Sequence, residues 1–344
     1  MTLPDNTSPS TSGKLTNAVP VANPAGPETT TLAGDHPGGG TSRSSGRGAV
    51  MTRRFIRNRT ALVGLAILVL LVAFAALGSV FTSYDYRSTD FAALGVPPGG
   101  PHLLGTNDAG VDLYASLVHG LQRSLVIAFS VALGTTVIAT IIGTVAAYVG
   151  GWVERITLQS IHFLLVVPSL LIVALVANRY GGDWKALIVV LIVFGWPFQA
   201  RVTWSLAQSV SEMDYVRAGK FLGLGAFRIS LRHIIPNMSS LIIVSTVLGV
   251  VTVVLTETSL SFLGFGVKIP DVTLGSLISD GQSTITSSPW LFWYPAAVLT
   301  LLTMSLSLIG DGLRDAFDPG SASGGRVRRA RSAKRAGKTK DSAS

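Results

Sequence analysis

Long runs of uncharged, mostly apolar residues alternate with short polar segments along the middle of the chain. Six of them approach the roughly 20 residues that a helix needs to cross about 30 Å of hydrocarbon. They lie at 60–84, at 124–153, between Arg155 and Arg179, at 186–200, between Arg232 and Glu257, and between Asp280 and Asp311. The fourth run is the shortest, and an earlier start at Trp184 would lengthen it. The pattern predicts an all-α, polytopic membrane protein with six transmembrane helices.

The positions of the charged residues predict how the chain is oriented in the membrane. If the N-terminus is cytoplasmic, the cytoplasmic segments hold 22 of the 27 Lys and Arg residues. That distribution satisfies the positive-inside rule. We therefore expect a multi-pass protein of the bacterial cell membrane with both termini in the cytoplasm. Topology and attraction to anionic membrane lipid explain the net charge of +9 without a nucleic-acid partner.

The amino-acid composition excludes several classes of protein. Charged residues make up 13% of the chain and hydrophobic residues 48%, which excludes an ordinary cytosolic enzyme and a mostly disordered protein. The chain has no cysteine, so disulfides and thiolate metal sites are excluded. Neither a phosphate-binding P-loop after a strand nor a nucleophile–base pair is visible. We expect no catalytic residue, no metal and no cofactor in this chain.

The two ends differ in composition from the membrane-spanning middle. Residues 1–50 contain 28 Gly, Pro, Ser or Thr residues and no aromatic residue, too little apolar surface to offset the entropy of ordering. We interpret 1–50 as a disordered cytoplasmic tail and 316–344 as a basic cytoplasmic tail. Between them we place the first transmembrane helix with an extracytoplasmic amphipathic segment, 51–120, and a domain of five further helices, 121–315.

The cytoplasmic loop 201–237 carries a short amphipathic pattern. One face of a helix over 214–223 is marked by residues at helical spacing: Tyr215, Ala218, Gly219 and Leu222. Asp214 suits the start of this helix and Gly223 its end. A second amphipathic stretch, 227–235, leads to Pro236. The spacing alone fits equally well a helix that lies on the membrane surface.

The same segment resembles the EAA loop of ABC-importer permeases. The matching positions are Arg217, Ala218, Gly219, Gly223, Ile234, Ile235 and Pro236. Arg217 stands where the family has Glu, and Gly219 where it has a second Ala. The resemblance implies a coupling helix over 214–223 that sits in a cleft of a cytosolic ATPase, with contacts from Asp214, Tyr215, Arg217, Ala218, Gly219, Leu222, Gly223 and Pro236. We expect Arg217 to pair with an acidic residue there, because guanidinium groups favour carboxylates.

Three further segments resemble the C-type permeases of dipeptide, oligopeptide and nickel importers. Segment 102–112 is similar to the family's H-x-L-G-T-D-x-x-G-R-D, with departures at Asn107 and Val111. Segment 257–266 is similar to E-x-S-L-S-F-L-G-x-G, and 310–319 to G-D-x-L-R-D-x-L-D-P. The resemblance covers about residues 53–319, with all four motifs in the family's order.

This resemblance implies a pore-forming subunit of an ATP-driven peptide importer. It implies as partners a homologous second permease, two cytosolic ABC ATPases that bind and hydrolyse ATP with Mg, and an extracytoplasmic substrate-binding protein. Import of nickel or another small solute is the alternative within the family. A secondary transporter is the alternative outside it, but such proteins need charged residues inside the membrane, and these spans hold almost none.

Several residues within or next to the spans are candidates for either a functional or a structural role. Glu257, near the outer end of the fifth span, either contacts a peptide in the translocation pathway or stabilises the next segment. Gln199 is expected to join neighbouring helices, and Pro168 to kink the third span. A group in and after segment 102–112 fits either a metal site or ordinary capping and packing: His102, Asp108, Asp112 and His119.

Overall fold

The computed structural model describes residues 47–214, 216, 219 and 225–317, which belong to one compact unit, Ser45–Ser344. The described residues are almost entirely helical, and their only β pairings are isolated bridges such as Thr106 with Asp112. This confirms the all-α prediction.

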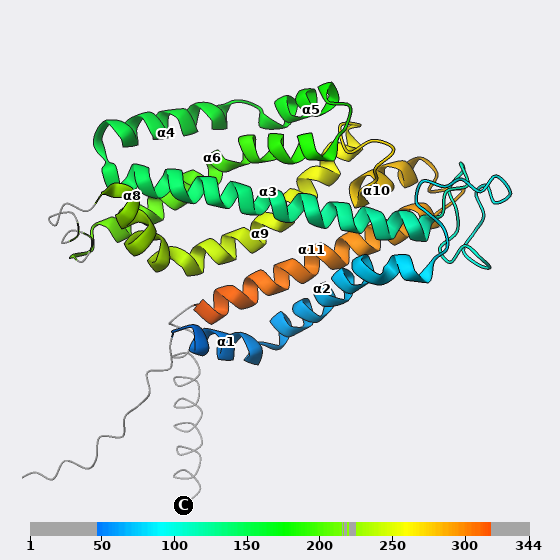
Figure 1. Ribbon diagram of the computed structural model, residues 1–344, viewed down its shortest axis with the longest axis horizontal. Helices are drawn as coiled ribbons and strands as arrows, with labels where there is room; N and C mark the ends of the chain where they lie inside the picture. The colour runs from blue at the N-terminus through cyan, green and yellow to red at the C-terminus, as the bar shows by residue number, and fades with distance from the viewer. Residues whose placement is uncertain (1–46, 215, 217–218, 220–224, 318–344) are drawn as a thin grey trace, which may run out of the picture. The chain divides into compact units, whose positions relative to one another are not determined.

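Five helices in the described part of the chain are long and apolar enough to cross a membrane. They are α2 (Arg59–Leu77) continued by η1 (Gly78–Phe81), α3 (Leu113–Val149), α6 (Trp184–Ser211), α8 to α9 (Ala226–Phe262) and α11 (Trp290–Phe317). The pair α4 (Gly151–Val166) and α5 (Ser169–Arg179) forms a sixth if it is counted as one bent span. The chain is therefore a multi-pass membrane protein with spans where the apolar runs predicted them (Figure 1).

The third span is broken at Pro168, as the sequence predicted. Helices α4 and α5 meet there at 75°. Proline has no N–H to donate and disfavours a helical conformation in the residue before it. Val167 is accordingly extended, with φ −70° and ψ 130°.

Helix α3 begins eleven residues before the predicted span, at Leu113 instead of residue 124. Arg123 interrupts the apolar run in the sequence but not the helix. Its guanidinium binds Asp271 at 3.2 Å and lies over the Trp184 ring at 4.3 Å. These partners satisfy the charge, so the helix continues through it.

The second amphipathic stretch of loop 201–237 is not a separate helix. Helix α8 (Ala226–Ile229) passes through η2 (Ser230–Ile234), one π-helical turn, directly into α9 (Ile235–Phe262). Pro236 lies in the first turn of α9, directly after this π-helical turn. The wide turn before it accommodates the proline ring.

Close packing holds the helices together at small residues. Gly143 of α3 faces α6, where an added Cβ would lie 2.8 Å from the Ala200 carbonyl oxygen. Gly312 of α11 faces Ala61 of α2 in the same way. Figure 1 shows α2 and α11 side by side, and α6 below α4 and α5, packed against them and against α3. Small residues of this kind let helix backbones approach closely.

One helix was not expected from the sequence. Helix α1 (Arg47–Arg57) precedes α2 and packs near the end of α11, with the Phe55 ring beside Gly312. Asn58 then caps α2, accepting from the backbone N–H of Thr60 at 3.1 Å and donating to Asp315 at 3.2 Å. The predicted tail 1–50 therefore ends in the first turn of a helix, and its residues 1–46 lie outside the described residues.

Candidate functional site

A cavity of about 610 Å³ lies among α3, α5, α6 and α9. Its walls are mostly apolar, with Phe194 and Phe198 from α6 and Leu170 from α5 among them. The polar side chains that line it are all uncharged: Thr135, Thr136, Ser169, Gln199, Ser245, Thr252 and Thr256. Within the described lining there is no Asp, Glu, Lys, Arg or His side chain. The cavity therefore suits a ligand that carries neutral polar groups.

Most of the cavity hydroxyls donate their hydrogen to their own helix. Thr252 donates to the Leu248 carbonyl at 3.2 Å, and Thr256 donates to the Thr252 carbonyl at 2.8 Å. Thr135 makes the same kind of bond to Val131. A hydroxyl used in this way has no hydrogen left to donate but keeps lone pairs that can accept. These residues therefore present acceptors to the cavity.

Gln199 differs from the other polar residues of the cavity because its side chain is a carboxamide. One N–H of its amide donates to the Ser245 hydroxyl at 2.9 Å, which joins α6 to α9. Next to it, the Thr246 hydroxyl lies 3.2 Å from the Thr136 hydroxyl and joins α9 to α3, while it also lies 2.7 Å from the Ile242 carbonyl of its own helix. The interhelical contact expected of Gln199 is confirmed, and it lies on the cavity wall.

Glu257 lies on α9 with its carboxylate turned away from the cavity. Its neighbours on the helix, Thr256 and Leu260, line the cavity, but Glu257 does not. Its side chain is 2% exposed. One carboxylate oxygen accepts from Thr273 at 2.7 Å and from Ser261 at 3.0 Å. In the described structure Glu257 thus stabilises the segment that follows α9 and does not line the cavity.

Thr273 begins α10 (Leu274–Ser283), and this explains the burial of Glu257. The Thr273 hydroxyl accepts from the backbone N–H of Ser276, and the Ser276 side chain accepts from the backbone N–H of Thr273. This capping box fixes the first turn of α10. Gly275 leaves room for the carboxylate, since a Cβ there would lie 2.7 Å from it. Glu257 therefore holds α10 against α9.

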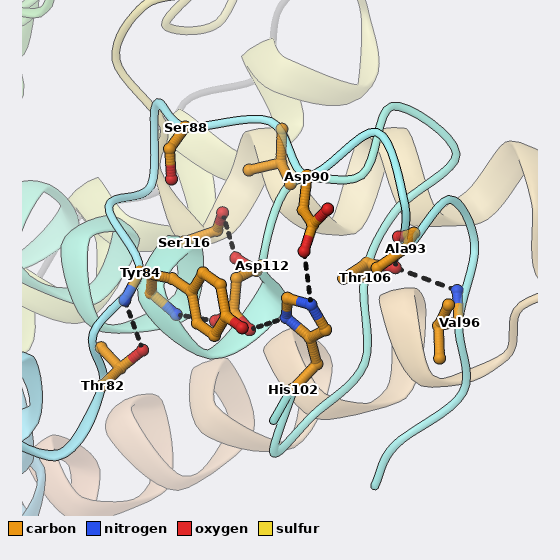
Figure 2. A network of polar contacts seen from close by, with 12 residues as sticks. Thr82, Tyr84, Ser88, Asp90, Ala93, Val96, His102, Thr106, Asp112 and Ser116 are labelled. Atoms are coloured by element: carbon orange, nitrogen blue, oxygen red, sulfur yellow. Dashed lines mark hydrogen bonds and ion pairs between the residues drawn. The ribbon is translucent and has the colours of Figure 1, made fainter. Parts of the chain in front are cut away.

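A second polar network stabilises the loop that precedes α3, over residues 82–112 (Figure 2). His102 is 2% exposed and stacks near the Tyr84 ring. Its Nδ1 lies 2.9 Å from Asp112, and its Nε2 lies 3.6 Å from Asp90. Asp112 also caps α3 by accepting from the backbone N–H of Ala115 at 2.8 Å. The network thus fastens the loop to the start of α3.

Asp271 forms a third polar cluster, at the same end of the helices as α10. It accepts from Arg123 and lies 3.2 Å from His119, whose ring stacks on Tyr86. Partial burial raises the pKa of Asp271, but the hydrogen bond from His119 and the positive charge and hydrogen bond of Arg123 outweigh it and hold the pKa below its usual value. The carboxylate therefore stays ionised at neutral pH.

The four residues weighed as a metal group are separated in the structure. His102 and Asp112 pair with each other, while His119 pairs with Asp271. Asp108 takes part in none of the ion pairs of the described residues that form these two networks. In the described part of the chain, no three His, Cys, Asp or Glu side chains converge on one point.

The predicted coupling helix falls largely outside the described residues. Tyr215, Arg217, Ala218, Leu222 and Gly223 lie outside them, so their contacts are not described. Asp214 is helical and exposed, while Gly219 is helical and buried. Between them, Val216 is 1% exposed and packs in a cluster with Ile229, Ile234 and Met238. The described part of this loop is thus attached to the start of α9.

Comparison with known proteins decides the family. Residues 118–322 match the family described as the inner membrane component of binding-protein-dependent transport systems. Residues 47–98 match the N-terminal transmembrane domain of oligopeptide transport permease C. The chain belongs to this permease family.

The curated relatives agree along most of the chain. The oligopeptide transport system permease protein OppC of Mycobacterium tuberculosis H37Rv is 41% identical over 80% of this chain and 96% of its own length. OppC of Bacillus subtilis 168 is 34% identical over 77% of this chain and 87% of its own length. A putative peptide permease protein of Brucella suis is 31% identical over 80% and 92%.

The sequence alone did not reveal that Gln199 and the hydroxyls of α3 and α9 share one cavity. Single Thr and Ser residues within apolar runs give no signal of their own, because most of them simply bond to the preceding turn. The pairing of Arg123 with Asp271 was also missed. These residues are 148 positions apart, and only the packing of the helices brings them together.

Proposed function

We propose that this chain is a transmembrane permease subunit of an ATP-driven ABC importer and forms half of the translocation pathway for oligopeptides. The observation that carries the proposal is the match of both parts of the chain to permeases whose curated relatives are named for oligopeptide transport. The uncharged, hydroxyl-lined cavity among α3, α5, α6 and α9 supports it, because peptides are rich in neutral hydrogen-bonding groups.

The partners proposed are those that such a subunit requires: a homologous second permease, two cytosolic ABC ATPases and an extracytoplasmic substrate-binding protein. The ATPases bind ATP and Mg, and this chain holds no cofactor and catalyses no reaction. We assign both termini to the cytoplasm and the α10 end of the helices to the opposite side. The excess of Lys and Arg in the terminal segments and in loop 201–237 supports this orientation.

Coupling to ATP is proposed to pass through the segment 214–223. Closure of the ATPase dimer would move this segment, and its buried residues would transmit the movement to the start of α9. Val216 packs in one cluster with Ile229, Ile234 and Met238, and α9 continues from there to the cavity residues that begin at Ser245. Nucleotide binding thereby biases a two-state element whose states differ in the side to which the cavity opens.

Import of nickel is the second candidate within the family. Ni²⁺ favours imidazole, carboxylate or thiolate ligands. The described cavity lining offers hydroxyls, one carboxamide and apolar groups instead. The named relatives and the cavity chemistry both favour peptide.

Purification of the tagged chain in mild detergent tests the assembly. We expect a second permease and ABC ATPases to co-purify, and mass spectrometry identifies them. ATP hydrolysis by the eluted complex should rise when peptide-loaded binding protein is added. Purification of the chain alone, together with peptide uptake into liposomes driven by an ion gradient, would contradict the proposal and favour a secondary transporter.

A further inference from the structure

Gln199 supplies the only carboxamide side chain in the described lining of the cavity. We propose that this carboxamide binds main-chain peptide groups of the substrate, so that this subunit recognises the peptide backbone and not the charges of its side chains. The inference rests on the proposed function, since it assigns a binding residue to the pathway of the same importer.

The hydrogen-bonding capacity of the cavity supports this role. Three threonine hydroxyls donate to backbone carbonyls of their own helices and can therefore only accept from a ligand: Thr135, Thr252 and Thr256. The Gln199 amide uses one N–H on Ser245. Its second N–H and its carbonyl oxygen have no partner among the described residues, and a carboxamide has two donors and one acceptor oxygen. Gln199 can therefore both donate to and accept from a ligand here, and unlike the hydroxyls of Thr136 and Ser169 it does so through two atoms of one planar group.

A peptide group has the same pair of functions, one N–H donor and one C=O acceptor. A carboxamide can satisfy both at once through two parallel hydrogen bonds. A peptide unit recurs at every residue of the substrate, whatever its side chains are. Recognition through this unit therefore suits an importer that moves many different sequences.

The absence of charge from the described lining supports the same conclusion. An ionised group in an apolar cavity is favoured only where an opposite charge lies close by. A charged lining would thus select peptides of opposite charge and reject the others. The described lining contains no charged side chain. The volume of the cavity, about 610 Å³, lies within the ordinary range of about 300–1,000 Å³ for ligand sites.

Gln199 also holds α6 to α9, so a purely structural role is the alternative. Two substitutions separate the roles. Gln199→Leu removes both the contact with Ser245 and the free amide groups, at similar side-chain volume. Ser245→Ala removes the same interhelical hydrogen bond but leaves the carboxamide in place. The matched control is Gln208→Leu, on the same helix but outside the cavity lining.

The test uses the complete importer in proteoliposomes with ATP inside and saturating binding protein outside. The substrates are three labelled peptides of equal length with a net charge of −1, 0 and +1, chosen for equal binding to the binding protein. The readouts are the initial uptake rate of each peptide and the rate of stimulated ATP hydrolysis.

We expect Gln199→Leu to lower uptake of all three peptides about tenfold, the loss of one or two hydrogen bonds, while ATP hydrolysis changes less than about twofold. Gln208→Leu should transport nearly as the wild type does, and Ser245→Ala should lose clearly less uptake than Gln199→Leu because the carboxamide remains. Gln199→Glu should favour the cationic peptide over the anionic one, a bias that a structural role would not produce.

Uptake by Gln199→Leu at the wild-type rate would overturn the inference and leave the proposed function intact. An equal loss in Ser245→Ala would also overturn it, because the interhelical contact would then explain the effect. Failure of the wild-type complex to move any peptide, despite ATP hydrolysis, would instead contradict the proposed function, and the inference would fall with it.

Discussion

The α10 end of the helices and the cavity among α3, α5, α6 and α9 use polar residues in opposite ways. At the α10 end, ionisable side chains are paired and hydrogen-bonded: His102 with Asp112, Arg123 with Asp271, and Glu257 with Thr273. In the cavity, the described side chains are uncharged, and the Gln199 amide keeps groups without a protein partner.

We interpret the difference as two roles: the polar residues at the α10 end hold loops and helix ends in place, and those of the cavity contact the transported ligand. A charge that is paired and shielded from water is costly to move, so it fixes a loop or a helix end in one place. A neutral hydroxyl or carboxamide exchanges partners at small cost. A subunit that must alternate between two states and pass a ligand needs buried, partnered ionisable groups at the end that stays fixed. It needs neutral polar groups along the translocation pathway. Substitutions at the two places should therefore affect different properties.

The largest expected effect on stability is at Glu257. Glu257→Leu leaves the hydroxyls of Thr273 and Ser261 without their buried acceptor and should cost about 3 kcal/mol. The matched control is Thr256→Val, on the neighbouring cavity face, which should cost less than about 1 kcal/mol because its hydroxyl bonds only its own helix. The measurement is the thermal denaturation temperature of the purified importer. Equal shifts for the two variants would contradict the contrast.

His102 should be next in magnitude. His102→Leu removes the partner of Asp112 from a buried site, and we expect a loss of about 2 kcal/mol with looser packing of residues 82–112. Hydrogen exchange of the loop amides measures this directly. Leu103→Ala, at a neighbouring side chain that is 53% exposed, serves as the control and should change little. Unaltered exchange in the His102 variant would show that the network does not hold the loop.

A smaller, pH-dependent effect is expected at Asp271. Asp271→Asn removes the charge that Arg123 and His119 face, and should cost about 1 kcal/mol at pH 7. The pKa of Asp271 is lower in the folded state than its usual value. Its contribution to the free energy of unfolding is therefore fully present above the unfolded pKa of about 3.9. The contribution is lost as the pH falls through the lower, folded pKa. Denaturation temperatures of wild type and variant should therefore converge in acid. A gap that stays constant with pH would exclude this origin.

The smallest effect is expected at Ser245. Ser245→Ala removes one hydrogen bond between neutral groups at the cavity wall, and the freed amide can bind water or ligand instead. We expect a loss below about 1 kcal/mol. A loss as large as that of Glu257→Leu would show that the cavity residues hold the helices together as firmly as the buried contacts of Glu257 do.

Much of the fold could be predicted because lipid imposes a simple requirement on the sequence. Apolar runs near 20 residues located the spans, and Pro168 located the break in the third. The helix ends were less predictable, because α3 continues through Arg123 and α9 continues past Glu257. Both side chains have partners that lie elsewhere in the sequence, Asp271 and Thr273, and a pattern of local hydropathy contains no information on such partners.

The candidate site was harder to predict than the spans. The helices around the cavity have no marked apolar and polar faces, so periodicity does not show which face of each one meets the others. Gln199 stood out as a lone amide, but Thr252 and Ser245 join it only through the packing of α6 against α9. The coupling residues Arg217 and Ala218 remain predictions from the family resemblance.

The most direct test of the central claim is the accessibility of the cavity during transport. The chain contains no cysteine, so Phe198→Cys introduces a unique thiol at the cavity wall, and Phe163→Cys introduces one on α4 outside it. A small hydrophilic thiol reagent is added to the assembled, transporting importer, with and without saturating peptide. We predict that the thiol at position 198 reacts and that peptide slows its reaction, while the thiol at position 163 responds to neither. A thiol at position 198 that is inert, or that reacts at the same rate with peptide present while uptake proceeds, would contradict the account.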